Sequence, residues 1–148
     1  MALKEKLKAD FITHYKARNQ DAVMVLRGVN AAIATEEKAG KQAVEFTDAQ
    51  VETLLAREVK KRRATAEEYQ KVGHADRAEK ETWEADFLAQ YLPKQMTEDE
   101  VREVIKGVLA DLGADAHQGM VMKTVMAQVK GKADGKLVKK LVDDLRNA

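Results

Sequence analysis

The chain has 148 residues, a length that allows one large domain or two small ones with a sizeable buried core. Hydrophobic residues make up 45% and charged residues 34%, which excludes a disordered chain, while one proline and 5% aromatic residues favour an all-α fold. The net charge of +1 excludes a surface that attracts nucleic acid everywhere, so any such function has to be local.

The first part of the sequence has the periodicity of helices. Apolar residues recur every four positions from Leu3 to Tyr15, and a second helical pattern from Ala22 to Ile33 ends at Gly40. Thr47 to Gln50 has the sequence of a capping box, in which two side chains bond the backbone N–H groups at the start of a helix. The sequence therefore predicts two helices and the start of a third.

The third helix is predicted to be the longest element, with about 25 residues and a length of about 37 Å. Gly73 ends it, and Pro93 ends a fourth helix. The apolar stripe of the third comprises Val51, Leu54, Leu55, Val59, Ala66, Tyr69 and Val72, and that of the fourth Ala78, Trp83, Phe87, Leu88, Tyr91 and Leu92. Together the four helices predict an N-terminal domain of long helices over residues 1–92.

A second, smaller domain is predicted over residues 93–148. The segment from Pro93 to Met96 is the best candidate boundary, and a second capping box, Thr97 to Glu100, follows it. Three amphipathic helices then have apolar stripes at Val101, Val104, Ile105, Val108, Leu109 and Leu112; at Val121, Met122, Val125, Met126 and Val129; and at Leu137, Val138, Leu141, Val142 and Leu145. Three such helices can close a small core.

The segment from Lys130 to Lys136, which we name the basic turn, lies between the last two predicted helices. Asp134 is predicted to be the N-cap of the last helix, which puts Lys136 in the first turn, where backbone N–H groups already present about half a positive charge. Lys132, Lys136 and Lys140 also recur at a spacing of four, which aligns like charges where the chain is helical. A bound anion would turn this unfavourable arrangement into a favourable one.

Positive charge is concentrated around the basic turn. Residues 123–140 contain six lysines and a single acid, Asp134, for a local net charge of +5. Gly131 and Gly135 allow the backbone to bend sharply or to approach a ligand closely. The predicted RNA-binding residues are Lys130, Gly131, Lys132, Asp134, Gly135, Lys136 and Lys140.

A structural explanation of the same segment stays open. Lys139 can pair with Asp143 and Lys140 with Asp144, both at a spacing of four, and would then be solvated ion pairs. A glycine-rich connection between two helices is also common without any ligand. From these residues alone, anion binding and a purely structural role for the segment are equally well supported.

A second basic run, Lys60 to Arg63, is predicted to be mainly structural. Four consecutive helical residues point in four directions, so only part of the run can face one ligand. Arg62 projects into the apolar stripe beside Glu58, which predicts a partly buried ion pair between the two.

Other kinds of site find no support in the sequence. Cysteine is absent, which excludes disulfides and thiolate metal sites, and the histidines, His14, His74 and His117, are far apart and predicted to be surface or cap residues. We therefore predict no catalytic residue, no metal and no cofactor.

Met120, Met122 and Met126 are predicted to fill the core. The N-terminus has no apolar run of signal-peptide length, and no stretch approaches the length of a membrane span, so we expect a cytoplasmic protein without a membrane partner.

Four motifs together resemble the GatB/YqeY family in order and spacing. They are Leu26-Arg27 followed by Ala31-Ala32-Ile33; Lys60 to Arg63 with Glu68-Tyr69; Tyr91-Leu92-Pro93-Lys94-Gln95; and Val129 to Gly135. The resemblance covers nearly the whole chain and is closer to a stand-alone YqeY-like protein than to a full GatB subunit. Three positions depart from the usual pattern, because Lys132 stands where arginine is usual, Met120 where lysine is usual and His74 where arginine is frequent.

The resemblance implies an N-terminal helical domain and a C-terminal domain like the tail of GatB, the transamidosome subunit that prepares Gln-tRNA and Asn-tRNA. That tail touches tRNA and does not contain the amidotransferase active site. The catalytic domain of GatB, with its metal and ATP sites, has no counterpart in 148 residues. By this analogy the chain is expected to bind tRNA or another structured RNA.

Two alternatives remain beside a non-catalytic RNA-binding accessory protein. The family is associated with carbon–nitrogen ligases that use glutamine as amide donor, so the chain could be a relative or a component of such an enzyme. The nucleophile that releases ammonia from glutamine is usually a cysteine or serine, and this sequence contains neither. The third possibility is a scaffold whose N-terminal helices bind a protein partner.

Overall fold

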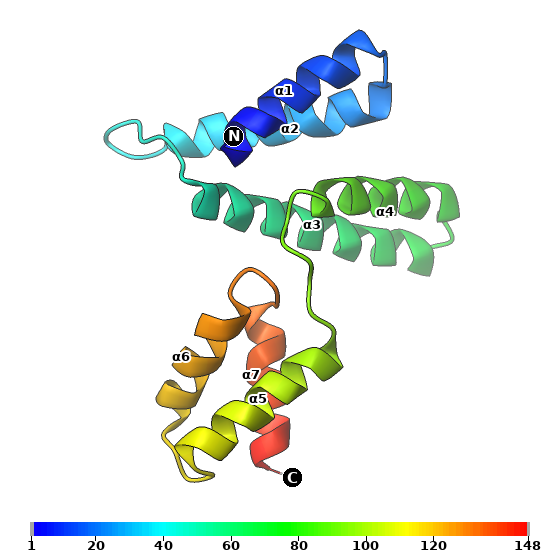
Figure 1. Cartoon of the computed structure of the whole chain (residues 1–148). Helices are drawn as coiled ribbons and strands as arrows, with labels where there is room; N and C mark the ends of the chain where they lie inside the picture. Colours follow the sequence, from blue (N-terminus) through cyan, green and yellow to red (C-terminus); the bar gives the residue numbers. More distant parts are fainter. Residues whose placement is uncertain (1, 148) are drawn as a thin grey trace. The chain divides into compact units, whose positions relative to one another are not determined.

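The structure, a computed structural model, describes residues 2–147. The prediction of an all-α fold is confirmed, because the described residues form seven helices and no strand (Figure 1). Contacts within the chain divide it into two compact units, one ending at Leu92 and the other beginning at Pro93. That each unit folds as an independent domain stays a prediction.

The first unit is built from two helical hairpins. Helices α1 (Leu3–Lys16) and α2 (Gln20–Glu37) form one, and α3 (Asp48–Lys71) and α4 (Ala75–Ala89) form the other (Figure 1). Both hairpins turn through a residue with left-handed backbone, Arg18 (φ 61°) and Gly73 (φ 81°). In each turn the next N–H group reaches back five residues to a helix carbonyl, a pattern that ends helices sharply.

The predicted capping box at the start of α3 is confirmed. The Gln50 N–H donates to the Thr47 hydroxyl at 3.3 Å, and the Thr47 N–H donates to the Gln50 side-chain oxygen at 2.9 Å. The helix then supplies its apolar stripe to a core shared by all four helices. The largest fully buried side chains of this core are Leu7, Leu26, Ile33, Leu54, Leu55 and Leu88.

Several side chains placed in the apolar stripes are more exposed than the sequence predicts. Tyr15 is 63% exposed, Val72 is 65% exposed, and Trp83 is 43% exposed although its ring stacks on Phe87 at 5.3 Å. Helix α4 also ends at Ala89, before the predicted end, because the N–H groups of Tyr91 and Leu92 bond the carbonyls three residues back, at Leu88 and Ala89, and so form a tighter turn. Tyr15 and Val72 lie at the ends of α1 and α3, whereas Trp83 lies in the middle of α4.

The second unit is a three-helix bundle. Helices α5 (Glu98–Leu112), α6 (Gln118–Val129) and α7 (Gly135–Arg146) all contact one another (Figure 1). Valine dominates the core, which comprises Val101, Ile105, Val108, Val121, Val125, Val129, Val138, Leu141 and Val142. Each fully buried residue of this size contributes roughly 1.5–3 kcal/mol relative to exposure, and these contributions must close a core of only three short helices.

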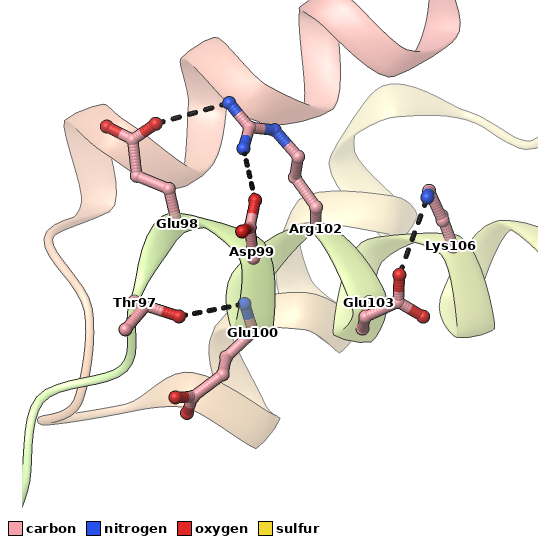
Figure 2. A network of polar contacts seen from close by, with 7 residues as sticks. All are labelled: Thr97, Glu98, Asp99, Glu100, Arg102, Glu103 and Lys106. Carbon is pink, nitrogen blue, oxygen red and sulfur yellow. Dashed lines mark hydrogen bonds and ion pairs between the residues drawn. The ribbon is translucent and has the colours of Figure 1, made fainter.

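The second predicted capping box is only half formed. The Glu100 N–H donates to the Thr97 hydroxyl at 3.2 Å (Figure 2). Within residues 2–147, the Glu100 carboxylate makes no return hydrogen bond to the Thr97 N–H. The helix start is therefore stabilised by one capping bond and not by two.

One of the three methionines predicted to fill the core does not do so. Met120 is 53% exposed, whereas Met122 and Met126 pack against the core of the second unit. Helix α6 buries the i, i+4, i+8 series that begins at Val121, and Met120 in the first turn falls outside that face. None of the described helices is long and apolar enough to cross a membrane.

Candidate nucleic-acid interface

The start of α7 has the predicted geometry with one difference. Asp134 occupies the N-cap position with extended backbone, so Lys136 is the second residue of the helix. The Asp134 carboxylate makes no capping hydrogen bond to the helix. The first helical bond runs from Val138 N–H to the Asp134 carbonyl at 3.0 Å.

Three backbone N–H groups at this helix start have no acceptor within residues 2–147. They belong to Gly135, Lys136 and Leu137, whose intrahelical acceptors would lie before the helix begins. Gly135 and Lys136 are exposed. The helix start therefore presents N–H donors and the positive end of the helix dipole to solvent.

The lysines of the candidate site are not neutralised by acids. Lys130, Lys132, Lys136 and Lys140 are exposed, and none makes an ion pair within the part of the chain that the structure describes. Their charge is therefore available to a ligand.

The two ion pairs considered on α7 are not formed among the described residues. Lys139 and Lys140 make no ion pair with Asp143 or Asp144. Asp143 instead accepts a hydrogen bond from the Gln118 side chain at 3.1 Å. This contact ties α7 to α6 and leaves both lysines solvated.

The two glycines of the basic turn have different roles. Gly131 has a φ of 77°, in the left-handed region that side chains disfavour, so the bend after α6 requires it. Gly135 needs no such backbone, and a Cβ atom added there would meet only the Met126 methyl at 3.9 Å. Gly135 therefore leaves open space in front of the helix start.

The basic turn is held in place by a segment that our site prediction missed. The Met96 N–H donates to the Lys132 carbonyl at 2.8 Å, and the Gln95 side-chain amide donates to the Gly131 carbonyl at 2.9 Å. The Lys132 N–H closes the turn on Val129 at 2.8 Å. The sequence identified the motif around Pro93, but it gave no sign that Gln95 of this motif bonds Gly131, 36 residues later.

Acidic residues at the start of α5 follow directly after this segment, and an arginine engages two of them. Arg102 donates to Asp99 at 2.9 Å and to Glu98 at 3.2 Å (Figure 2). Lys106 bonds Glu103 in the same way, at 3.4 Å, and Figure 2 shows this contact as well. These two cations offset only part of the negative charge of α5, which carries five acids, and exposed pairs of this kind stabilise little.

The run from Lys60 to Arg63 is engaged in structural contacts, as predicted. Arg62 pairs with Glu58 at 2.6 Å and with Glu84 of α4 at 3.2 Å, and both acids are partly buried. Arg63 pairs with Asp86 at 3.1 Å. The bonds to Glu84 and Asp86 join α3 to α4, so these two arginines help to hold the second hairpin together.

The histidines are surface or cap residues, as expected. His117 is the N-cap of α6, where its Nδ1 accepts from the Gly119 N–H at 3.1 Å, and His74 is the N-cap of α4. His14 contacts Asn19 at 3.0 Å and packs edge-on against Phe87. Residues 2–147 contain no group of three or more His, Asp or Glu side chains placed to hold a metal ion.

The fold and the site define a small all-helical protein with a lysine-lined helix start in its second unit. Residues 4–145 match the family described as Yqey-like protein, and the chain belongs to that family. The family resemblance noted from the sequence is thereby confirmed.

A curated fungal protein is also similar. The chain is 29% identical over 109 residues to the Altered inheritance of mitochondria protein 41, mitochondrial, of Pyrenophora tritici-repentis. The match covers 72% of this chain and 59% of the fungal protein, so the chain spans less than two thirds of that relative's length.

Proposed function

We propose that the protein is a non-catalytic accessory protein that binds tRNA, or RNA of similar structure, through the start of α7. Lys130, Lys132, Lys136 and Lys140 would contact backbone phosphates, and the N–H groups that follow Asp134 would donate to a phosphate oxygen. The observation that carries the proposal is the presence of exposed lysines without ion pairs around a helix start whose N–H groups have no acceptor among the described residues.

The proposed mode of binding is recognition of the phosphate backbone. Exposed lysines release counterions when they meet phosphates, and this release makes the affinity fall steeply with salt. The sequence from Pro93 onward contains no Phe, Trp or Tyr, so the His117 imidazole at the start of α6 is the one aromatic ring of the second unit on which a base could stack. Contacts to phosphate fix position without reading sequence, which favours a partner recognised by its shape.

The proposal is tested by measuring tRNA affinity over a range of salt concentrations, with an RNA duplex for comparison. The double variant Lys132→Gln and Lys136→Gln removes two of the proposed contacts and should lower the slope of log affinity against log salt by about two. At 0.15 M salt this corresponds to roughly 30-fold weaker binding if the affinity near 1 M is unchanged.

A matched control carries Lys41→Gln and Lys80→Gln, two exposed lysines of the first unit that make no ion pair within residues 2–147. It has the same net charge as the test variant. If both double variants lose the same affinity, the binding depends on overall charge and the site is wrong. If the wild-type chain does not bind tRNA, the function itself is wrong.

A protein-interaction scaffold is the second candidate, and one observation favours it. Tyr15 and Trp83 expose large aromatic surfaces on the first unit, and such surfaces are often used to bind proteins. A partner that stays bound after nuclease treatment would support the scaffold. A partner released by the same treatment would support RNA binding.

A relation to glutamine-dependent amidotransferases remains the third candidate and rests on the family analogy alone. The chain lacks both serine and cysteine, so we expect no release of glutamate from glutamine by the isolated protein. Glutaminase activity of the purified chain would contradict this expectation.

We propose the cytoplasm as the site of action. The fungal relative carries the word mitochondrial in its name, which makes an organelle the alternative. Cell fractionation with an antibody against the chain would decide between them.

A further inference from the structure

We infer that the phosphate-binding surface has a second wall, formed by Lys94 and Gln95 in the segment that joins the two units. Lys94 would be a further phosphate-contacting cation, and Gln95 a positioning residue that fixes the basic turn. This inference rests on the proposed function and assigns the site to a polyanion that offers several phosphates at once.

Gln95 links two segments that are distant in the sequence. Its side-chain Nε2 donates to the Gly131 carbonyl at 2.9 Å and to the Pro93 carbonyl, two residues earlier in the chain, at 3.1 Å. Gly131 is the residue whose left-handed backbone makes the bend. The amide group of Gln95 therefore bonds the backbone of its own segment at Pro93 and the backbone of the basic turn at Gly131.

The backbone of the next residue reinforces this contact. The Met96 N–H donates to the Lys132 carbonyl at 2.8 Å, and the Met96 side chain packs against the core of the second unit. The joining segment is thus anchored on one side to the basic turn and on the other to the core. The exposed lysines of the turn are held on a defined backbone and not on a loose loop.

The bond between Met96 and Lys132 also limits how far Lys94 can lie from the basic turn. Two peptide units separate Lys94 from Met96, so its Cα atom lies within about 7.6 Å of the residue that bonds Lys132. Its side chain is exposed and makes no ion pair within the described part of the chain. Lys94 therefore lies close enough along the chain to contact a phosphate chain that the basic turn also holds.

Charge on two segments favours a ligand longer than a single phosphate. One phosphate at the start of α7 would be satisfied by the N–H groups and one or two lysines. Lysines that project from both segments are better matched to consecutive phosphates of a nucleic-acid backbone. Inorganic phosphate should therefore compete poorly with tRNA for this surface.

The role of Lys94 is tested with Lys94→Gln in the full chain. The slope of log tRNA affinity against log salt should fall by about one, and binding at 0.15 M salt should weaken roughly fivefold. Lys80→Gln, an exposed lysine of the first unit with the same charge change, should lose less affinity. Equal losses in the two variants, or displacement of tRNA by inorganic phosphate at low millimolar concentration, would overturn the inference.

The role of Gln95 is tested with Gln95→Met, which keeps the length of the side chain and removes its N–H donors. The Met96 N–H, which donates to Lys132, should exchange with solvent at least several-fold faster, and this measurement requires no RNA. The affinity for tRNA should fall with an unchanged salt slope, because no charge is lost. Unchanged exchange of the Met96 N–H, or a changed slope, would overturn the positioning role.

These results separate the inference from the function on which it rests. If the wild-type chain does not bind tRNA, both are wrong. If binding responds to Lys132→Gln as expected while Lys94→Gln behaves like Lys80→Gln, the function stands and only the second wall is wrong.

Discussion

Lys136→Glu should make the protein more stable and at the same time a weaker RNA binder. Lys136 is the second residue of α7, where a cation opposes the helix dipole and an anion complements it. Exchanging one for the other should gain about 0.3–1 kcal/mol. The new carboxylate would also face Lys140 at a spacing of four, which adds roughly 0.2–0.5 kcal/mol.

The expected gain is therefore about 1 kcal/mol in the free energy of unfolding, or roughly 2–4 °C in Tm for a chain of this size. Urea unfolding and calorimetry would measure it. Binding of tRNA at 0.15 M salt should weaken by at least about fivefold, because one phosphate contact is lost and a repulsive charge is added. Opposite changes in stability and affinity are the signature of a cation retained for a ligand.

The control is Lys139→Glu, on the same helix and with the same charge change but outside the first turn. It should bring no gain in stability, since its new carboxylate faces Asp143 at a spacing of four. If Lys136→Glu lowers the stability, or leaves tRNA affinity at the wild-type value, the electrostatic account of the helix start is refuted.

Three further predictions concern the stability of the fold. Arg18→Gly should raise the free energy of unfolding by about 0.5–1 kcal/mol in urea, because Arg18 has left-handed backbone (φ 61°) that glycine adopts without strain. Arg146→Met should lower it by about 1–3 kcal/mol in the same assay, because the guanidinium bonds Gln118 and two loop carbonyls. The Lys4 ammonium at 2.6 Å lowers the pKa of Glu37 below its ordinary value, so the stability from this pair is present at neutral pH and is lost as the pH falls through that lowered pKa. Thermal unfolding between pH 7 and pH 3 should show a shallower decline for Glu37→Gln than for the wild type.

Local signals in the sequence were enough to predict the helices. The capping box at Thr47, the glycine at Gly73 and the proline at Pro93 act within a few residues, so each marks an element boundary without knowledge of the fold. The pair between Arg62 and Glu58 was predictable for the same reason, since a spacing of four sets its geometry.

Contacts between distant segments could not be predicted in this way. Nothing within a few residues of Gln95 indicates that its amide reaches Gly131, because that contact depends on how three helices pack. The exposure of Met120 and Trp83 could not be predicted either, because periodicity alone does not reveal which residues of a helix its neighbours cover. The lysines of the basic turn were identifiable because their pattern conflicts with the preferences of an isolated helix.

The most direct test of the central claim is an NMR titration of the isotope-labelled full chain with tRNA at low salt. If the start of α7 holds phosphates, the largest shifts should fall on the N–H signals of Gly135, Lys136 and Leu137, and they should disappear as salt is raised. Shifts confined to the first unit, or unchanged signals at these three residues while tRNA is bound, would contradict the account.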